Sequence, residues 1–349
     1  MKLKKIYKVL IIILLSIAAA VTGCGAVVYY TFCYPVFNIN SGGENKYIYI
    51  SDENKDFGVL CRELRDSVGC RNIKAFEWLA KYRNYPANMK AGRYVVEPNM
   101  SVNSLLNRLR LGQQIPVRIT FNNIRLLNEL ADRLAQQLML EPDDLMKYLT
   151  DETYCESLGF TTETIGTIFI PNTYEVWWNI SAEKLIAKMK REFETFWTED
   201  RRQKAENLHL SPVEVSILAS IVEEETAAPE EYPIVAGLYI NRLFKGMPLQ
   251  ADPTVKYAVG DFTLHRILNR HLETESPYNT YLHTGLPPGP IRLPSPASID
   301  AVLNRTIHNY LFMCAKDDFS GRHNFAVTLS EHNRNADAYR RELNKKGIY

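Results

Sequence analysis

The sequence predicts a mixed α+β protein with an N-terminal transmembrane helix, a small α+β module and a helix-rich mixed domain. Residues 9–32 are 24 positions without a charged side chain, about the number that a helix needs to cross a bilayer. Strand and helix patterns alternate over residues 46–114, and helical patterns dominate residues 115–349. The 349 residues suffice for two domains, which usually hold about 100 to 200 residues each.

The apolar stretch indicates a membrane anchor with a defined direction. It is preceded by Lys2, Lys4, Lys5 and Lys8, and no charge follows it closely. Positive charge gathers on the cytoplasmic side, which predicts residues 1–8 in the cytoplasm, residues 9–32 in the membrane and the remainder outside. The main alternative is a cleaved signal peptide, although the stretch exceeds a normal signal core and ends in no clear A-x-A site.

A second alternative concerns Cys24. The run Val21-Thr22-Gly23-Cys24 resembles a bacterial lipoprotein cleavage box, which would make Cys24 a lipidated first residue. The protein stays attached to the membrane in this case as well.

Composition and cysteine spacing argue against nucleic acid binding, a disulfide framework and a zinc site. The 41 Lys and Arg balance 40 Asp and Glu, so the global charge calls for no nucleic acid. Four cysteines in the exported part do not make a disulfide framework, although Cys61 and Cys70 could form a bridge or remain free thiols. The chain has no C-x-x-C pair and no H-E-x-x-H motif, so the sequence gives little support for a zinc site.

The small module is predicted over residues 46–114, after a polar linker at residues 33–45. Alternating and helical patterns give, in order, a strand at 47–50, helices at 56–66 and 73–82, a strand within 90–97 and a helix at 101–111. This succession is typical of a compact α+β unit.

The larger region, residues 115–349, begins with an alternating strand at 117–121 and a helix-rich stretch at 125–158. A further amphipathic helix is predicted at 181–197. The next helix starts at Ser211, which suits the N-cap, with Pro212 at the first helical position and Glu214 completing a capping box.

That helix ends in three consecutive glutamates. At about 100° per residue, Glu225 falls in the middle of the apolar arc, Glu224 at its edge and Glu223 on the opposite, outward side. A carboxyl group on an apolar face loses hydration, so its pKa should rise and it could donate a proton near neutral pH. The alternative is a helix end at which all three acids are solvated.

Polar and aromatic residues that suit sugar recognition follow this helix. Tyrosine rings can stack on apolar sugar faces, while amides and hydroxyls pair with the sugar rim. The candidates are Asn241, Gln250, Asp252, Tyr278, Asn279 and Tyr281, followed by a rigid Pro/Gly segment at residues 285–291. Each residue taken alone could equally be part of a capped turn or of the core.

These motifs together resemble the MltG (YceG-like) family of endolytic murein transglycosylases. The resemblance lies in ASIVEEET around Glu225, NRL at Asn241, LQADPTVKYAVG at Leu249, SPYNTY at Ser276 and GLPPGPI at Gly285. Supporting matches are KAGRY at Lys90, IFIPNTYEV at Ile168 and HNFAVTLSEHN at His323. One departure is Asn172, which stands where the family usually has Asp and puts a chemical role at this position in doubt.

The resemblance implies a bacterial inner-membrane, single-pass lyase with its catalytic domain in the periplasm. It implies a LysM-like module at residues 46–114 and a YceG-like catalytic domain at 115–349. Glu225 would be the catalytic residue, Glu223 a structural or substrate-contacting group, and the six polar residues after the helix would bind substrate. Peptidoglycan strands and cell-wall synthases are the implied partners, and no cofactor is implied.

The implied reaction cleaves the β-1,4 bond between N-acetylmuramic acid and N-acetylglucosamine of nascent strands without water. It leaves 1,6-anhydro ends and limits strand length. One alternative is a muramidase that uses water, with Glu225 as acid and Asp252 positioning the nucleophile. A second alternative is a non-catalytic, membrane-anchored glycan-binding protein that recruits synthases.

Overall fold

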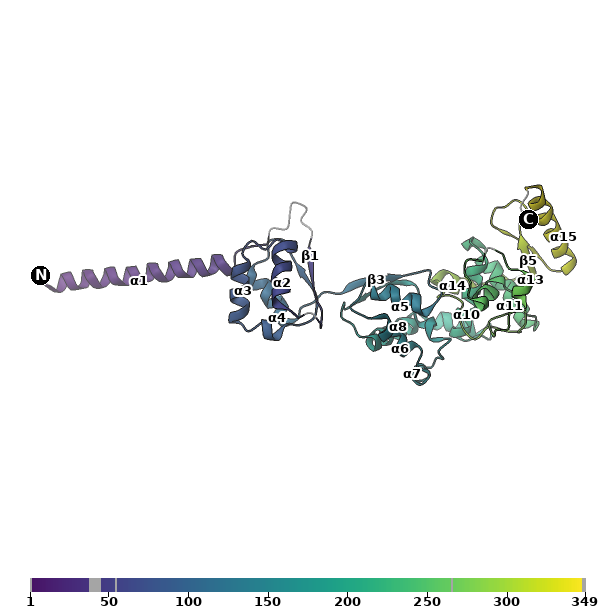
Figure 1. Cartoon of the computed structure of the whole chain (residues 1–349), viewed down its shortest axis with the longest axis horizontal. Helices are drawn as coiled ribbons and strands as arrows, with labels where there is room; N and C mark the ends of the chain where they lie inside the picture. The colour runs from purple at the N-terminus through teal and green to yellow at the C-terminus, as the bar shows by residue number, and fades with distance from the viewer. Residues whose placement is uncertain (1, 38–44, 54, 265, 347–349) are drawn as a thin grey trace. The chain divides into compact units, whose positions relative to one another are not determined.

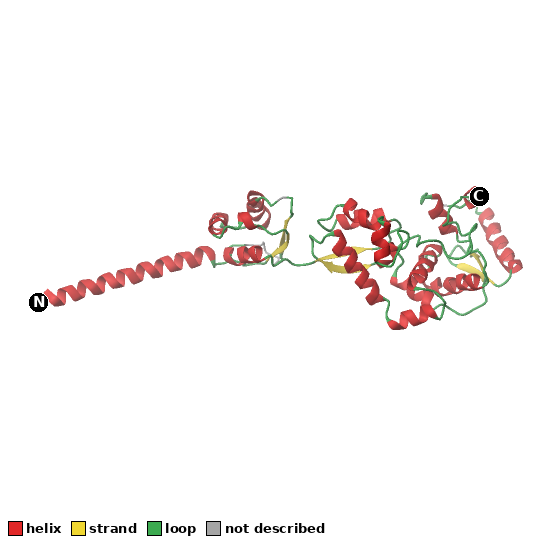
Figure 2. Ribbon diagram, turned by 90° about the horizontal axis from the view of Figure 1, so that it is seen from below, coloured by secondary structure: helices red, strands yellow, loops and turns green. Residues whose placement is uncertain are grey.

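The computed structural model describes residues 2–37, 45–53, 55–264 and 266–346. The chain divides into two compact units (Figure 1). Unit 1 comprises Met1–Arg118 with Gln137–Met139 and Glu175–Ile180, and unit 2 comprises the remaining residues. In the described residues the strands form three two-stranded sheets, and helices make up most of the fold (Figure 2). The prediction of a mixed helix and sheet architecture is confirmed.

Unit 1 begins with α1 (Lys2–Phe32), the one described helix that is long and apolar enough to cross a membrane. The chain then enters the unit directly. Pro35 forms a bridge with Ser101 and Phe37 with Cys70, and Phe37 is only 2% exposed. The predicted linker is therefore wrong for residues 35–37, because an apolar Val-Phe pair is buried there; residues 38–44 lie outside the described residues.

The rest of this unit packs helices on a two-stranded antiparallel sheet. Its strands are β1 (Lys46–Ile50) and β2 (Gly92–Val96), paired so that Ile48 faces Tyr94. The helical segments are α2 (Phe57–Glu63), a π-helical turn η1 (Leu64–Val68), α3 (Ile73–Tyr82), η2 (Pro86–Asn88) and α4 (Val102–Leu111). The helix expected over residues 56–66 thus ends in a π turn. Cys61 and Cys70 are buried free thiols.

The first part of unit 2 follows β3 (Val117–Phe121), which pairs with β4 (Asn172–Val176). Its helical segments are α5 (Leu127–Ala135), α6 (Pro142–Leu149), α7 (Glu152–Ser157), η3 (Ile165–Ile168), α8 (Ala182–Phe196) and α9 (Glu199–Glu206). Ser181 caps α8 by accepting a hydrogen bond from the Lys184 amide, as expected for this residue type.

The second part of unit 2 is built around α10 (Pro212–Glu225). The other helical segments are η4 (Pro229–Glu231), α11 (Tyr232–Phe244), α12 (Asp252–Val259), α13 (Asn269–Leu272), α14 (Pro296–Leu303) and α15 (Leu329–Lys345). An antiparallel pair, β5 (Phe312–Ala315) and β6 (His323–Ala326), packs against α15.

The predicted start of α10 is confirmed, but its predicted one-sided burial is wrong. The Ser211 amide donates to Glu214 Oε2 (2.7 Å) and the Glu214 amide donates to Ser211 Oγ (3.2 Å), which completes the capping box. Every residue from 215 to 222 is buried, because α14 covers the side that carries Ser216, Ala219 and Ser220. These small side chains allow α14 to approach closely, and residues 215–222 have no exposed face.

Candidate active site

Glu225 is the last residue of α10, and its carboxyl group is withdrawn from water. Its Oε2 is buried and has no hydrogen-bond partner among the described residues. Burial, reinforced by the negative charge of Asp252, raises the pKa of Glu225 from 4.5 to about 8. A hydrogen bond from Tyr239 and the positive charge of Arg242 oppose this rise without cancelling it. The carboxyl group therefore keeps its proton at neutral pH.

Glu225 lines a pocket of about 260 Å³. Helix α11 supplies Tyr239 and Arg242, one turn apart, the segment before α12 supplies Gln250, and the first residue of α12 is Asp252. Tyr281 completes this side of the pocket by donating its hydroxyl to Asp252 Oδ1 at 2.7 Å. Of the residues that the sequence singled out, the structure brings together Glu225, Gln250, Asp252 and Tyr281.

Arg242 is held rigidly beside the acid. Its Nε donates to the Leu311 carbonyl (2.7 Å), and its Nη1 donates to the Leu249 carbonyl (2.8 Å) and to Gln250 Oε1 (3.2 Å). The residue is only 7% exposed. Burial lowers the pKa of this guanidinium, which nevertheless remains a cation at physiological pH.

A second, larger cavity of about 830 Å³ meets the same carboxyl group. Glu225 and Asp252 line it together with Lys256 and Arg266, and α15 contributes Tyr339 and Arg340. The acid thus lies between a small polar pocket and a wider cleft. That position allows an extended ligand to pass across the carboxyl group.

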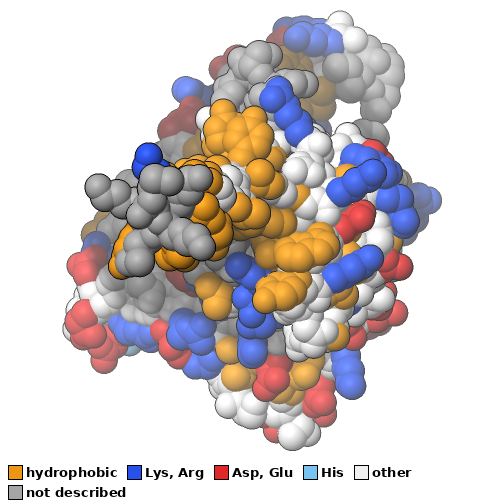
Figure 3. All heavy atoms as spheres, turned by 90° about the vertical axis from the view of Figure 1, so that its left-hand side faces the viewer, with side chains coloured by type: hydrophobic (Ala, Val, Ile, Leu, Met, Phe, Trp, Pro, Cys, Tyr) orange, Lys and Arg blue, Asp and Glu red, His pale blue; other side chains and the backbone are white. Residues whose placement is uncertain are grey.

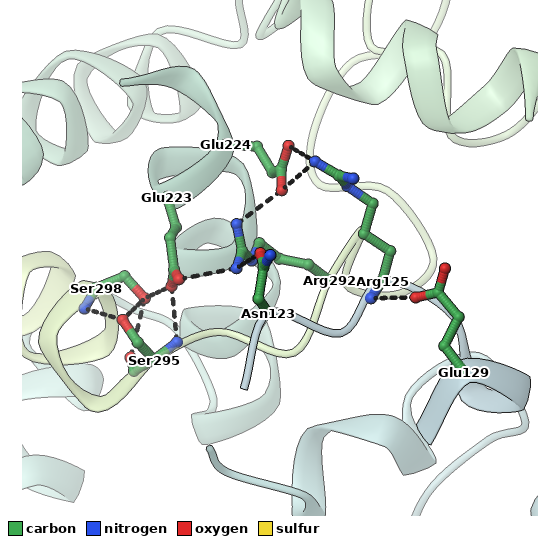
Figure 4. Close-up of polar contacts among 8 residues, drawn as sticks. All are labelled: Asn123, Arg125, Glu129, Glu223, Glu224, Arg292, Ser295 and Ser298. Carbon is green, nitrogen blue, oxygen red and sulfur yellow. Dashed lines mark hydrogen bonds and ion pairs between the residues drawn. The ribbon is translucent and has the colours of Figure 1, made fainter. Parts of the chain in front are cut away.

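Glu223 and Glu224 are held by two arginines (Figure 4). Glu224 pairs with Arg292 Nη1 (2.7 Å) and with Arg125 Nη2 (3.0 Å). Glu223 pairs more loosely with Arg292 Nη2 (3.3 Å), and its Oε2 accepts hydrogen bonds from the Ser295 amide and the Ser298 hydroxyl, both at 2.7 Å.

The predicted outward orientation of Glu223 is therefore wrong. The side chains of Glu223 and Glu224 are 12% and 14% exposed, respectively. The start of α14 covers the side of α10 on which Glu223 lies. The alternative of three solvated glutamates is excluded by the same contacts.

Three other candidates lie outside the pocket. The Asn241 amide donates to the carbonyls of His308 (2.8 Å) and Tyr310 (3.1 Å). Asn279 is fully buried, and its amide donates to the carbonyls of Leu272 and Thr274, each at 2.9 Å. Both amides hold loops in place. Tyr278 packs on Tyr257 and lines a separate cavity of about 220 Å³.

The sequence reading missed several groups of the site. Tyr239 and Arg242 share one face of α11, and the NRL motif marks Arg242 without indicating where it points. His323 reaches the pocket from β6 and pairs with Glu231 (2.8 Å), which also accepts a hydrogen bond from Thr226 (3.0 Å). No group of three or more His, Cys, Asp and Glu side chains that could hold a metal ion occurs in the part of the chain that the structure describes.

Comparison with known proteins places the chain in a family. Residues 49–338 match the model of the YceG-like family. The chain belongs to the YceG-like family. The endolytic murein transglycosylase of Bacillus subtilis is 30% identical over 298 residues, which cover 79% of this chain and 80% of that protein.

Two further relatives extend the comparison. The endolytic murein transglycosylase of Streptococcus pneumoniae is 30% identical over 74% of this chain, which spans only 52% of that longer protein. The crystal structure of a YceG-like protein from Listeria monocytogenes aligns with a TM-score of 0.55 and 28% identity, covering 84% of this chain and 99% of that one. The fold of this YceG-like chain is therefore seen in a solved structure.

Replacing Glu225 by Gln should remove a pH-dependent loss of stability. The folded state raises the Glu225 pKa from 4.5 to about 8, so between these values it binds the proton more tightly than the unfolded chain does. The contribution of this group to the free energy of unfolding therefore falls as pH rises through that window. Gln mimics the neutral acid at every pH. The stability advantage of Glu225→Gln should thus be near zero at about pH 4 and reach roughly a few kcal/mol above about pH 8.

Chemical unfolding of the wild-type and Glu225→Gln proteins at several pH values measures this difference. Glu199→Gln, an exposed Glu-to-Gln change on α9, is the matched control and should show no such growth. An advantage that is independent of pH would contradict the prediction.

Replacing Arg292 by Met should destabilise unit 2 strongly. The change leaves two largely buried carboxylates with one arginine fewer, and breaking a buried ion pair costs about 3 to 5 kcal/mol. The matched control is Arg322→Met, whose pair with Glu230 is exposed, at 51% and 56% for the two side chains; such pairs contribute about 0 to 1 kcal/mol. Denaturant unfolding measures the free energy of unfolding of both variants. Equal losses in the two variants would contradict the prediction that the buried pairs of Arg292 with Glu223 and Glu224 stabilise unit 2.

Proposed function

We propose that this chain is an endolytic peptidoglycan lytic transglycosylase and that Glu225 is its catalytic residue. The observation that carries the proposal is a carboxyl group with a buried and unpaired Oε2 and a raised pKa, at the junction of a polar pocket and a cleft. Membership of the YceG-like family and the names of the murein transglycosylase relatives support the same class of reaction.

In the proposed reaction, protonated Glu225 donates to the oxygen of the β-1,4 bond between N-acetylmuramic acid and N-acetylglucosamine. The bond between that oxygen and C1 of the muramic sugar breaks, and C1 becomes oxocarbenium-like. The Glu225 carboxylate then accepts the proton of the C6 hydroxyl of the same sugar, whose oxygen attacks C1. The products are an N-acetylglucosamine end and a 1,6-anhydro end, and no water is consumed.

The neighbours of Glu225 have distinct proposed roles. Arg242 balances the charge of the carboxylate that forms after proton donation, because it is fixed nearby and remains cationic. Asp252, oriented by Tyr281, faces the positive charge that develops at C1 and raises the Glu225 pKa in the resting enzyme. Gln250 and Tyr281 contact the sugar from the pocket wall. Glu223, Asn241 and Asn279 position the segments that carry these groups, and Tyr278 lines an outer subsite.

The remaining parts of the chain support this role. We assign residues 9–32 to a single-pass inner-membrane anchor, with residues 1–8 in the cytoplasm and the catalytic domain, residues 115–349, in the periplasm. Residues 46–114 form a LysM-like module that binds glycan. Cleavage of nascent strands beside the membrane limits their length. We expect the protein to associate with the synthases that polymerise these strands.

The product of digestion tests the proposal. Full-length protein incubated with uncrosslinked glycan strands should release fragments with 1,6-anhydro ends, detected by mass spectrometry. Glu225→Gln should lower the rate by a factor of about 10³ or more, since it removes both the acid and the base. The exposed change Glu199→Gln should leave the rate unchanged. Reducing muramic acid ends would identify a muramidase instead, and absence of any cleavage by the wild type would favour the non-catalytic alternative.

The pH dependence of kcat/KM should report the proton on Glu225. Because the acid must be protonated before cleavage and its pKa is about 8, kcat/KM should fall above about pH 8. Asp252→Asn removes a charge that raises this pKa, so the falling limb should move to lower pH. Steady-state rates across pH measure both effects. If the pH at which kcat/KM falls is unchanged or higher in Asp252→Asn, the proposed effect of the Asp252 charge on the Glu225 pKa is contradicted.

A further inference from the structure

The chain leaves the apolar helix and enters unit 1 almost at once. α1 ends at Phe32, and the Val36 amide already donates to the Met100 carbonyl at 3.1 Å. Pro35 and Phe37 form bridges to Ser101 and Cys70 on either side of that bond. If α1 spans a membrane, as the proposed function requires, unit 1 has no slack with which to move away from the bilayer surface.

The length of α1 places its last turns among the lipid headgroups. The uncharged part, residues 9–32, has 24 residues, which as a helix extend about 36 Å, whereas the hydrocarbon core is about 30 Å thick. The excess brings Tyr29, Tyr30 and Phe32 to the membrane–water interface. Aromatic side chains are enriched at that depth, where their apolar rings and polar edges are both accommodated.

Helix α3 adds two more aromatic side chains, Trp78 and Tyr82, next to Phe32 of α1. It runs across the end of α1 and contacts it (Figure 1). The Phe32 ring stacks on Trp78 with centroids 5.3 Å apart, and Trp78 stacks on Tyr82, also at 5.3 Å. Trp78 and Tyr82 remain 57% and 75% exposed. Two large rings thus stand open at the level of the helix end, on the face opposite the buried side of α3.

Basic side chains surround these rings. Between residues 71 and 83 the chain carries four cations, Arg71, Lys74, Lys81 and Arg83, and one acid, Glu77. Seen from the end that bears α1, hydrophobic side chains lie beside Lys and Arg side chains (Figure 3). Positive charge next to exposed Trp and Tyr fits anionic headgroups above an apolar layer.

We propose that α3 is an interfacial helix that binds the surface of an anionic phospholipid bilayer. Trp78 and Tyr82 insert among the headgroups beside α1, while Lys74 and Lys81 pair with lipid phosphates. Unit 1 is thereby fixed in orientation as well as in height above the membrane. The surface is distinct from the pocket of Glu225 and needs no glycan.

Fluorescence quenching in vesicles tests this contact. The full-length chain, carrying Glu225→Gln so that glycan cleavage plays no part, is reconstituted into phospholipid vesicles brominated just below the headgroups. Vesicles are first separated by flotation on a density gradient and only the floating fraction is measured, so that every protein molecule in the sample is inserted in a bilayer. The contribution of Trp78 is the difference between this protein and the same protein with Trp78→Phe. The matched control is Trp177→Phe, since Trp177 belongs to unit 1, is 49% exposed and adjoins Trp178, which contacts Tyr49 of β1.

Bromolipid should quench Trp78 about twofold or more strongly than Trp177, because only Trp78 lies among the headgroups, close to the bromine atoms. Phosphatidylglycerol should increase the quenching of Trp78, and Lys74→Gln with Lys81→Gln should abolish that increase. Lys147→Gln with Lys184→Gln, the same loss of charge at exposed sites of unit 2, should retain it. Equal quenching of Trp78 and Trp177, or no effect of phosphatidylglycerol, overturns the proposal.

Discussion

The burial of three consecutive carboxyl groups at the end of α10 is the constraint on which the site depends. A carboxylate that leaves water must gain a cation, gain hydrogen bonds or become neutral. The chain uses all three solutions. Glu224 is paired with two arginines, Glu223 combines one arginine with two hydrogen bonds from the start of α14, and Glu225 is protonated. The same helix end therefore holds two acids paired with arginine and one acid whose pKa is raised.

This arrangement requires groups from distant parts of the chain. Arg125 lies 99 residues before Glu224, and Arg292 lies 68 residues after it. Arg292 also donates to Asn123 (2.8 Å), so the segment that leads into α5, the loop before α14 and the last turn of α10 are joined in one network (Figure 4). Because these contacts fix the two preceding residues, the direction in which Glu225 leaves the helix is fixed as well.

Local patterns predicted the start of α10 and distinguished Glu225, the residue proposed to be catalytic, from its neighbours. The capping box at Ser211 and Glu214 defined the start of α10, and helical phase separated Glu225 from its neighbours. The same phase argument failed for Glu223, because it assumed that a helix of a soluble domain has one exposed side, whereas the start of α14, 72 residues further on, covers that side. It also could not find Arg242, because its role depends on the carbonyls of Leu249 and Leu311, which only the tertiary fold brings to it. Asn241 and Asn279 show the opposite case: both belong to conspicuous motifs, but their side chains hydrogen-bond to loop carbonyls and do not line the pocket.

The two acids that share the pocket, Glu225 and Asp252, lie at opposite kinds of helix end. Glu225 is the last residue of α10, where the helix dipole presents partial negative charge and disfavours a carboxylate. Asp252 is the first residue of α12, where free backbone amides and partial positive charge favour one. Desolvation acts on Glu225 in the same direction as its dipole, and the charge of Asp252 adds to both effects. The raised pKa of Glu225 thus follows from where the fold places the ends of α10 and α12 as well as from burial.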